Sequence, residues 1–195
     1  MENDSSSKAP GNNQNPKEPK DVSLKEGVRE NVQEVSGEVN PIPKAGISEV
    51  LGLLEVLDDR KGKVKVYTLA RDLNFDFSNL LLVIKAAEML DFVYTPGTDV
   101  VLKALGKKMI EIDMNAKKKI VLNQLRKLSL FQYLREHLMT RDDKRMSRQD
   151  FLDLCQLALP KEIPDQVFDT VINWGRYAEF LGYSTDDGYV YLDQG

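Results

Sequence analysis

Cysteine, histidine and tryptophan are scarce in this chain, whose 195 residues contain one of each. The single thiol, Cys155, excludes an internal disulfide framework and is typical of a reducing compartment. With only His137 beside it, the sequence has no cysteine–histidine cluster with the spacing of a metal site. Cys155 stands among leucines, so we expect it to be a small core residue rather than a reactive thiol.

Motifs that would identify an enzyme are also missing. No glycine-rich loop ends in Gly-Lys-Ser or Gly-Lys-Thr, so nothing in the sequence would cradle a nucleotide phosphate. No Gly-x-Ser-x-Gly elbow occurs. Asp58 and Asp59 follow an apolar run, but that run has helical spacing and predicts a turn rather than a metal-binding carboxylate pair. We therefore expect no catalytic residue, no cofactor and no metal ion.

Long apolar runs are absent as well. None approaches the ~20 residues that a bilayer crossing needs, and the opening MENDSSSKAPGNNQNP has no apolar core of a signal peptide. The net charge of −4 and the pI near 5.2 give no general attraction to nucleic acid or to an anionic membrane. These features predict a cytoplasmic protein without a transmembrane segment.

Residues 1–45 are rich in Asn, Ser, Pro, Glu and Lys and contain no aromatic residue. Such a segment buries too little surface to offset its chain entropy, so we expect a disordered tail that is dispensable for folding. The remainder divides into a first unit over residues 46–104 and a second part over residues 105–195, made of connecting helices and a second unit.

Apolar periodicity and turn residues predict a mainly α, α+β protein with two tandem winged helix-turn-helix units carrying small β-hairpin wings. In the first unit we expect helices over 47–57 (with Ser48 as candidate cap), 67–73 and 78–90, a strand over 64–66, and a hairpin over 92–95 and 99–102. In the second part we expect two helical pieces over 104–138 with a break near Asn115, a helix over 148–158 capped by Ser147, and a helix and hairpin over 167–192.

The stretch from Val167 to Leu192, VFDTVINWGRYAEFLGYSTDDGYVYL, carries the clearest pattern. An apolar stripe recurs at helical spacing in Val167, Val171, Trp174, Ala178 and Leu181. Pro164 suits the first turn of this helix, Gly182 is expected to break it, and Asp187-Gly188 is a two-residue hairpin signal. Glu88-Met89-Leu90-Asp91-Phe92 and Glu179-Phe180-Leu181-Gly182-Tyr183 lead into the two hairpins and predict a structural repeat.

Basic residues gather on the connecting helices rather than on the helices before the hairpins. A helix that reads DNA needs Arg, Lys, Asn or Gln directed at base edges, and residues 78–90 offer only Lys85. The basic patch is either a solvated face or a contact for an acidic partner or phosphate. Its residues are Lys117, Lys118, Lys119, Arg126, Lys127, Arg145 and Arg148.

Four residues of the last helix fall away from its apolar stripe: Asn173, Arg176, Tyr177 and Phe180. They either pack the helix on the first unit, which we favour, or form a partner face, because aromatic residues and Arg are enriched at interface centres.

INWGRYAEFLGY followed by an acidic hairpin resembles the end of the AAA-associated C-terminal domain of nitrate/sulfonate/taurine-type ABC transporter ATP-binding proteins. EVLGLLEVLDDRKGKVKVYTLARDLN, LLLVIKAAEMLDFV and LCQLALPKEIPDQVFDTVINWGRYAE also match, so the resemblance covers Ile47 to Asp193. It implies an accessory or regulatory role attached to a transport ATPase on the cytoplasmic side of a bacterial membrane. An ATPase core should precede this domain, but only the polar tail does, so we expect a stand-alone paralogue or a separated subunit.

The leading hypothesis is a non-catalytic accessory module that contacts protein, either an ABC-importer ATPase or a second copy of itself. The alternative is a winged-helix DNA-binding transcriptional regulator that uses the basic connecting helices. An ATP-hydrolysing transport subunit is disfavoured because the phosphate loop is missing.

Overall fold

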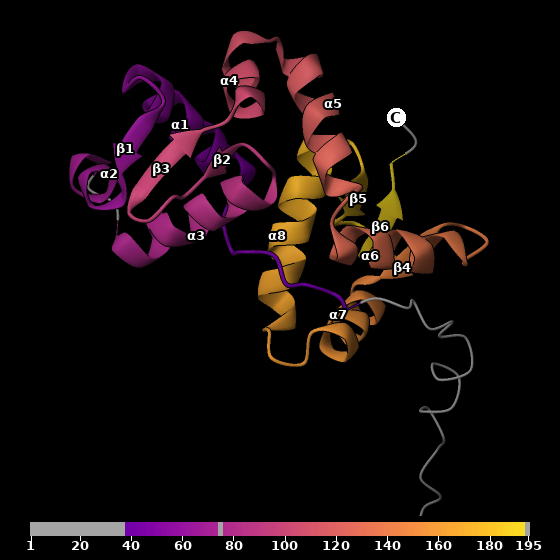
Figure 1. The fold of residues 1–195 in the computed structure, drawn as a ribbon. Helices are drawn as coiled ribbons and strands as arrows, with labels where there is room; N and C mark the ends of the chain where they lie inside the picture. Colours follow the sequence, from indigo (N-terminus) through magenta and orange to yellow (C-terminus); the bar gives the residue numbers. More distant parts are fainter. Residues whose placement is uncertain (1–37, 74–75, 194–195) are drawn as a thin grey trace, which may run out of the picture. The chain divides into compact units, whose positions relative to one another are not determined.

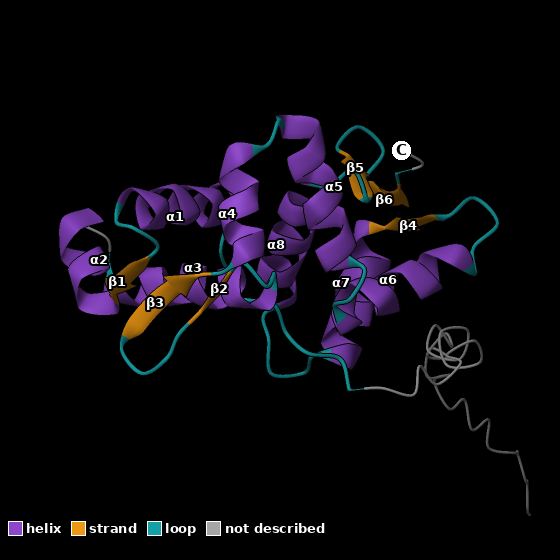
Figure 2. Cartoon of the chain, turned by 45° about the horizontal axis from the view of Figure 1, so that its top comes forward, coloured by secondary structure: helices purple, strands orange, loops and turns teal. Residues whose placement is uncertain are grey.

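The fold was analysed in a computed structural model, which describes residues 38–73 and 76–193. These residues form a mainly helical α+β structure of eight helices and two three-stranded antiparallel sheets (Figures 1 and 2). No helix in the described part of the chain combines the length and apolar character that a membrane crossing requires.

The elements fall into two sets of the same order: helix, strand, helix, helix, strand, strand. The first set is α1 Ile47–Asp59, β1 Lys63–Lys65, α2 Val66–Leu73, α3 Phe77–Met89, β2 Val93–Tyr94 and β3 Asp99–Leu102. Helices α4 Ala104–Glu111 and α5 Met114–Leu125 connect the sets. The second set is α6 Ser129–Met139, β4 Arg145–Ser147, α7 Arg148–Ala158, α8 Pro164–Tyr177, β5 Leu181–Ser184 and β6 Tyr189–Leu192. The strand orders, β1-β3-β2 and β4-β6-β5, are also equivalent.

Hydrogen bonds at the ends of α3 and α8 establish which residues of the two sets correspond. Asp91 and Glu179 both have positive φ, 64° and 53°, and end their helices in the left-handed region. The next residues, Phe92 and Phe180, donate their N–H to Ala87 and Gly175 carbonyls over 2.9 Å each. Phe92 therefore corresponds to Phe180. The predicted repeat is present, but the expected match of Glu88 with Glu179 is wrong by three residues.

Gly182 does not end the last helix as expected, because Glu179 has already done so. It lies within β5, where an added Cβ would come within 2.2 Å of the Tyr191 ring. The hairpin itself is confirmed, but its loop has four residues, since Ser184 pairs with Tyr189. Gly188, at φ 74°, provides the left-handed residue that closes this turn.

The connecting region contains one more break than the sequence indicates. Residues expected in two helical pieces form α4, α5 and α6, with breaks at 112–113 and 126–128. The first is near the expected place, and Asp113 caps α5 by accepting a hydrogen bond from Ala116 N over 3.0 Å. The second contains neither Gly nor Pro. This break allows α6 to bury Leu130, Phe131 and Leu134 in the core. Tertiary packing therefore accounts for the second break.

Helix starts were predicted well where the cap is local. Ser147 caps α7 by accepting from Asp150 N over 3.1 Å, and Pro164 occupies the first turn of α8, both as expected. Ser48 is not the cap of α1. The N-terminus of α1 is capped instead by the Glu49 carboxylate, which accepts from Gly46 N over 2.6 Å. The side-chain amide oxygen of Asn173 on α8 is the second acceptor. Strand β4 was not predicted.

Trp174 lies at the centre of the second set and is fully buried. Its ring is stacked on that of Phe131, with centroids 6.5 Å apart and planes 8° from parallel. The stripe of apolar residues predicted for this helix is buried along its whole length. Cys155 is also buried, as predicted, and burial raises the pKa of its thiol to about 12.

Residues 38–46, here called the strap, pack against the second set, although the sequence placed 38–45 in the disordered tail. Ile42 and Ala45 are buried. The Trp174 indole N–H donates to Ala45 O over 2.7 Å, and Asn40 N donates to Ser129 Oγ over 2.9 Å. The packed chain thus begins before residue 45, whereas residues 1–37 lie outside the described residues.

We expect removal of the strap to destabilise the fold. A chain that begins at Gly46 loses the burial of Ile42 and leaves the Trp174 N–H without its carbonyl. Losing a buried aliphatic side chain costs about 1.5–3 kcal/mol, and an unsatisfied buried donor costs about 1–3 kcal/mol. In thermal unfolding, this chain should melt about 5–15 °C below one that begins at Ser36. Equal melting temperatures would show that the strap contributes nothing.

Candidate functional site

A groove of about 540 Å³ lies between α5, α6 and the segments next to the strands of the second sheet. It is lined by Asn115, Lys118, Lys119, Leu122, Arg126, Arg135, Met139, Lys144, Ala178, Glu179, Phe180, Leu192 and Asp193. A neighbouring hollow of about 510 Å³ shares Arg126, Arg135 and Phe180 with it. Because the two hollows share these three residues, we name them together the basic groove.

One face of helix α5 lines the basic groove. Its lining residues recur at positions 115, 118, 119, 122 and 126, a spacing that keeps side chains on one side of a helix. The opposite side of α5 is buried through Val121, Gln124 and Leu125. Helix α5 is therefore anchored by its apolar side, close to α8 (Figure 1), and leaves the other side open to solvent.

Cations outnumber carboxylates along this groove by five to three, the carboxylates being Glu136, Glu179 and Asp193. One cation is neutralised within the fold, because Lys118 forms an ion pair with Glu179 over 2.6 Å. The hydrogen bond to Glu179 also raises the pKa of Lys118. Across residues 38–73 and 76–193, the other four cations form no ion pair with a carboxylate: Lys119, Arg126, Arg135 and Lys144.

Apolar side chains line the same groove beneath these charges. Phe180 is buried, with its ring centroid 5.9 Å from that of Phe131. Met139 is 46% exposed, and Leu122 and Leu192 are half-buried. An exposed Met beside a fixed aromatic ring gives an adaptable apolar surface. The groove therefore combines an unneutralised positive rim with an apolar floor.

The predicted basic patch separates into two groups in the structure. Lys118, Lys119 and Arg126 line the groove together with Arg135 and Lys144, which lie outside the predicted patch. These two lie on another helix and in a loop, so only tertiary packing brings them to α5. No local pattern could have identified them as part of the same site.

The remaining basic-patch residues have other surroundings. Arg145 pairs with Asp187 over 2.6 Å and lies over the Tyr189 ring. Arg148 pairs with Asp165 and lies over the Phe168 ring. These two arginines are fixed by the second set itself. Lys127 donates to Gln124 over 3.0 Å, and Lys117 is half-buried on α5.

The four residues set apart on the last helix mostly make internal contacts. Asn173 Oδ1 accepts from Ile47 N over 2.9 Å and so caps α1. The Tyr177 hydroxyl donates to Met114 Sδ over 3.5 Å, and burial raises its pKa. Phe180 is buried, so it can reach a partner only as part of the groove floor. Arg176 alone is exposed with no internal contact of this kind among the described residues.

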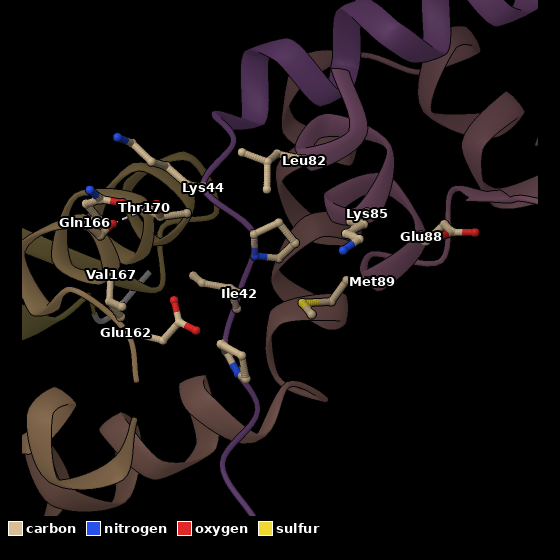
Figure 3. Close-up of a pocket in the computed structure, with 12 residues that line it drawn as sticks. Ile42, Lys44, Leu82, Lys85, Glu88, Met89, Glu162, Gln166, Val167 and Thr170 are labelled. Carbon is tan, nitrogen blue, oxygen red and sulfur yellow. Dashed lines mark hydrogen bonds between the residues drawn. The ribbon is translucent and has the colours of Figure 1, made fainter. Parts of the chain in front are cut away.

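A second hollow, of about 750 Å³, lies beside the strap between α3 and α8 (Figure 3). Leu82, Met89, Ile42 and Val167 give it an apolar lining. Figure 3 shows Lys85 and Met89 directed toward the strap from α3, with Glu88 turned away. Its charged residues, Lys44, Lys85, Glu88 and Glu162, balance, so it offers no net charge to a ligand. The basic groove is chemically the more selective site.

The structure thus has two sets of helices and strands in the same order, with the basic groove beside the second set. A family model described as the C-terminal AAA-associated domain matches residues 67–184, more than half of the chain. The chain belongs to this family, as its sequence motifs indicate. The family is an accessory domain linked to AAA or ABC ATPases and is not itself a catalytic domain. Searches of curated proteins and of solved structures returned no match.

Proposed function

We propose that this chain is a non-catalytic regulatory module that contacts the ATPase of a nitrate-, sulfonate- or taurine-type ABC importer. The observation that carries the proposal is the family match over residues 67–184. The proposal places the chain in the cytoplasm, at the inner face of the plasma membrane where such an ATPase works. The contact residues are the unpaired cations of the basic groove, together with exposed Arg176 on α8.

We further propose that the two sets are winged helix-turn-helix units, within residues 46–104 and 105–195. The shared element order and strand order support this assignment. In such units the helix before the hairpin is the element that enters a DNA groove. Here α8 has seven buried residues among its fourteen, and α3 exposes Phe77 and Leu81. The burial of half of α8 and the apolar exposed face of α3 favour contact with protein over binding to DNA.

Binding to a purified ABC-importer ATPase of this type from the same cell tests the proposal. The full chain should bind the ATPase saturably in isothermal titration calorimetry and change its rate of ATP hydrolysis. Duplex DNA should bind only weakly, with an affinity that falls steeply as salt rises. If calorimetry shows no binding and the rate of ATP hydrolysis does not change, the proposed function is wrong. Nanomolar binding to one DNA sequence would favour the regulator.

A further inference from the structure

The geometry points to one occupant for the basic groove: an acidic amphipathic helix of a partner protein, laid along α5. This inference rests on the proposed function, because it names the surface through which the partner would be held. Nothing in the family description assigns a binding site to these residues. Three features of the groove favour this occupant: its length, its charge and its apolar floor.

The length of the groove suits a helix. Its lining on α5 extends from Asn115 to Arg126, a span of about 16 Å at 1.5 Å per residue. A partner helix of about three turns would cover it. Helix-in-groove recognition uses side chains at i, i+3, i+4 and i+7, and α5 offers its own residues at this spacing. Two helices can therefore pack lengthwise here.

Charge selects an acidic partner. Arg126 and Arg135 line both hollows of the groove. Lys119 and Lys144 extend the positive rim, and none of these four cations has a carboxylate partner among the described residues. A partner with Glu or Asp on one face would supply the carboxylates that the fold leaves out, with bidentate pairing at the arginines.

The apolar floor distinguishes a helix from a simple anion. Phosphate or nucleic-acid backbone would satisfy the cations but leave Met139, Leu122 and Leu192 uncovered. An amphipathic helix covers both, because its apolar stripe can lie on this floor while its acidic edges reach the rim. Aromatic residues and Met with a surrounding polar rim are the usual composition of such contacts.

The test uses the full chain and a fluorescent acidic peptide of about four helical turns, with Leu at i, i+3, i+4 and i+7 and Glu elsewhere. Two control peptides are needed. One has the same composition with its Leu residues distributed around the helix, and the other has Gln in place of Glu. Binding is followed by fluorescence anisotropy, with tripolyphosphate and duplex DNA as competitors. We expect saturable binding of the first peptide and at least tenfold weaker binding of both controls.

Variants locate the binding in the groove. The double variant Arg126→Ala/Arg135→Ala should weaken peptide binding at least tenfold. The matched control Lys107→Ala/Lys108→Ala removes the same charge from exposed positions of α4 and should change it less than about twofold, since distant exposed charges are screened. Met139→Gln tests the floor without altering charge and should weaken binding severalfold. Unchanged melting temperatures show that each variant is folded.

The possible outcomes distinguish the proposed helix-binding groove from the proposed function on which it rests. If the peptide does not bind, if the scrambled peptide binds equally well, or if tripolyphosphate or DNA displaces it at lower concentration, the helix assignment is overturned. Equal binding of an ABC ATPase to the wild type and to Arg126→Ala/Arg135→Ala also overturns it, together with the groove cations as contact residues, while leaving the regulatory contact with the ATPase intact. Failure of the wild type to bind the ATPase counts against the proposed function, whatever the peptide does.

Discussion

Replacement of Trp174 by Ala is expected to unfold most of the protein at physiological temperature. The indole is fully buried and stacked on Phe131, and its N–H donates to Ala45 O in the strap over 2.7 Å. Truncating a buried Trp costs about 3–5 kcal/mol, a large share of a total stability of about 5–15 kcal/mol. Urea unfolding followed by circular dichroism would measure the loss.

Two companion variants separate the contributions to this loss of stability. Trp174→Phe keeps an aromatic ring against Phe131 but leaves Ala45 O without its donor, so we expect an intermediate loss of about 1–3 kcal/mol. Leu157→Ala removes a side chain on α7 that is 60% exposed, and should change stability by less than about 0.5 kcal/mol. A stable Trp174→Ala protein would mean that the core is not organised around this ring.

Replacement of Gly106 by Ala is expected to destabilise the junction between the first set and α4. An added Cβ would lie 2.3 Å from the backbone oxygen of Phe92 and 2.8 Å from Leu102 Cδ1. That oxygen already accepts a hydrogen bond from Lys103 N over 2.9 Å, so it cannot move without breaking the turn. Overpacking of this kind costs about 1–3 kcal/mol or more, which exceeds the helix propensity gained with Ala.

Gly52→Ala is the matched control for this prediction. Gly52 also lies inside a helix, α1, but an added Cβ there would meet nothing within 4 Å. The substitution should therefore stabilise the protein by about 0.5–1 kcal/mol, the propensity difference between the two residues. Thermal unfolding should thus move in opposite directions for the two glycines. A stabilised Gly106→Ala variant would contradict the close approach of α4 to Phe92.

The sequence predicted elements whose signals lie within a few residues. The apolar stripe of α8, the Ser147 cap and Pro164 all act between neighbours one turn apart, so their effect is present before any tertiary structure forms. The same holds for the hairpin that Asp187-Gly188 indicated, although its loop is longer than expected. The most specific part of the family resemblance, the Asn173–Glu179 string, covers the end of this helix and the turn after it.

Candidate site residues were predicted only in part, since their grouping depends on distance in space. Lys118, Lys119 and Arg126 share a face of α5 and could be recognised together. Arg135 and Lys144 have no sequence relation to that face. Phe180 was expected to pack the helix on the first unit or to belong to a partner face, but the Glu179 turn carries it inward to Phe131 of the second set. Helical spacing does not extend through a residue with positive φ.

The sequence by itself determined the class of fold, the faces of the long helices and the family, because these depend on local periodicity and composition. The tertiary structure decided which residues of the two sets correspond, that Asn173 caps α1 across 126 positions of chain, and that the strap belongs to the fold. It also decided the composition of the basic groove. Each of these depends on a contact between distant segments, and the free energy of such a contact arises only when packing has brought both partners together.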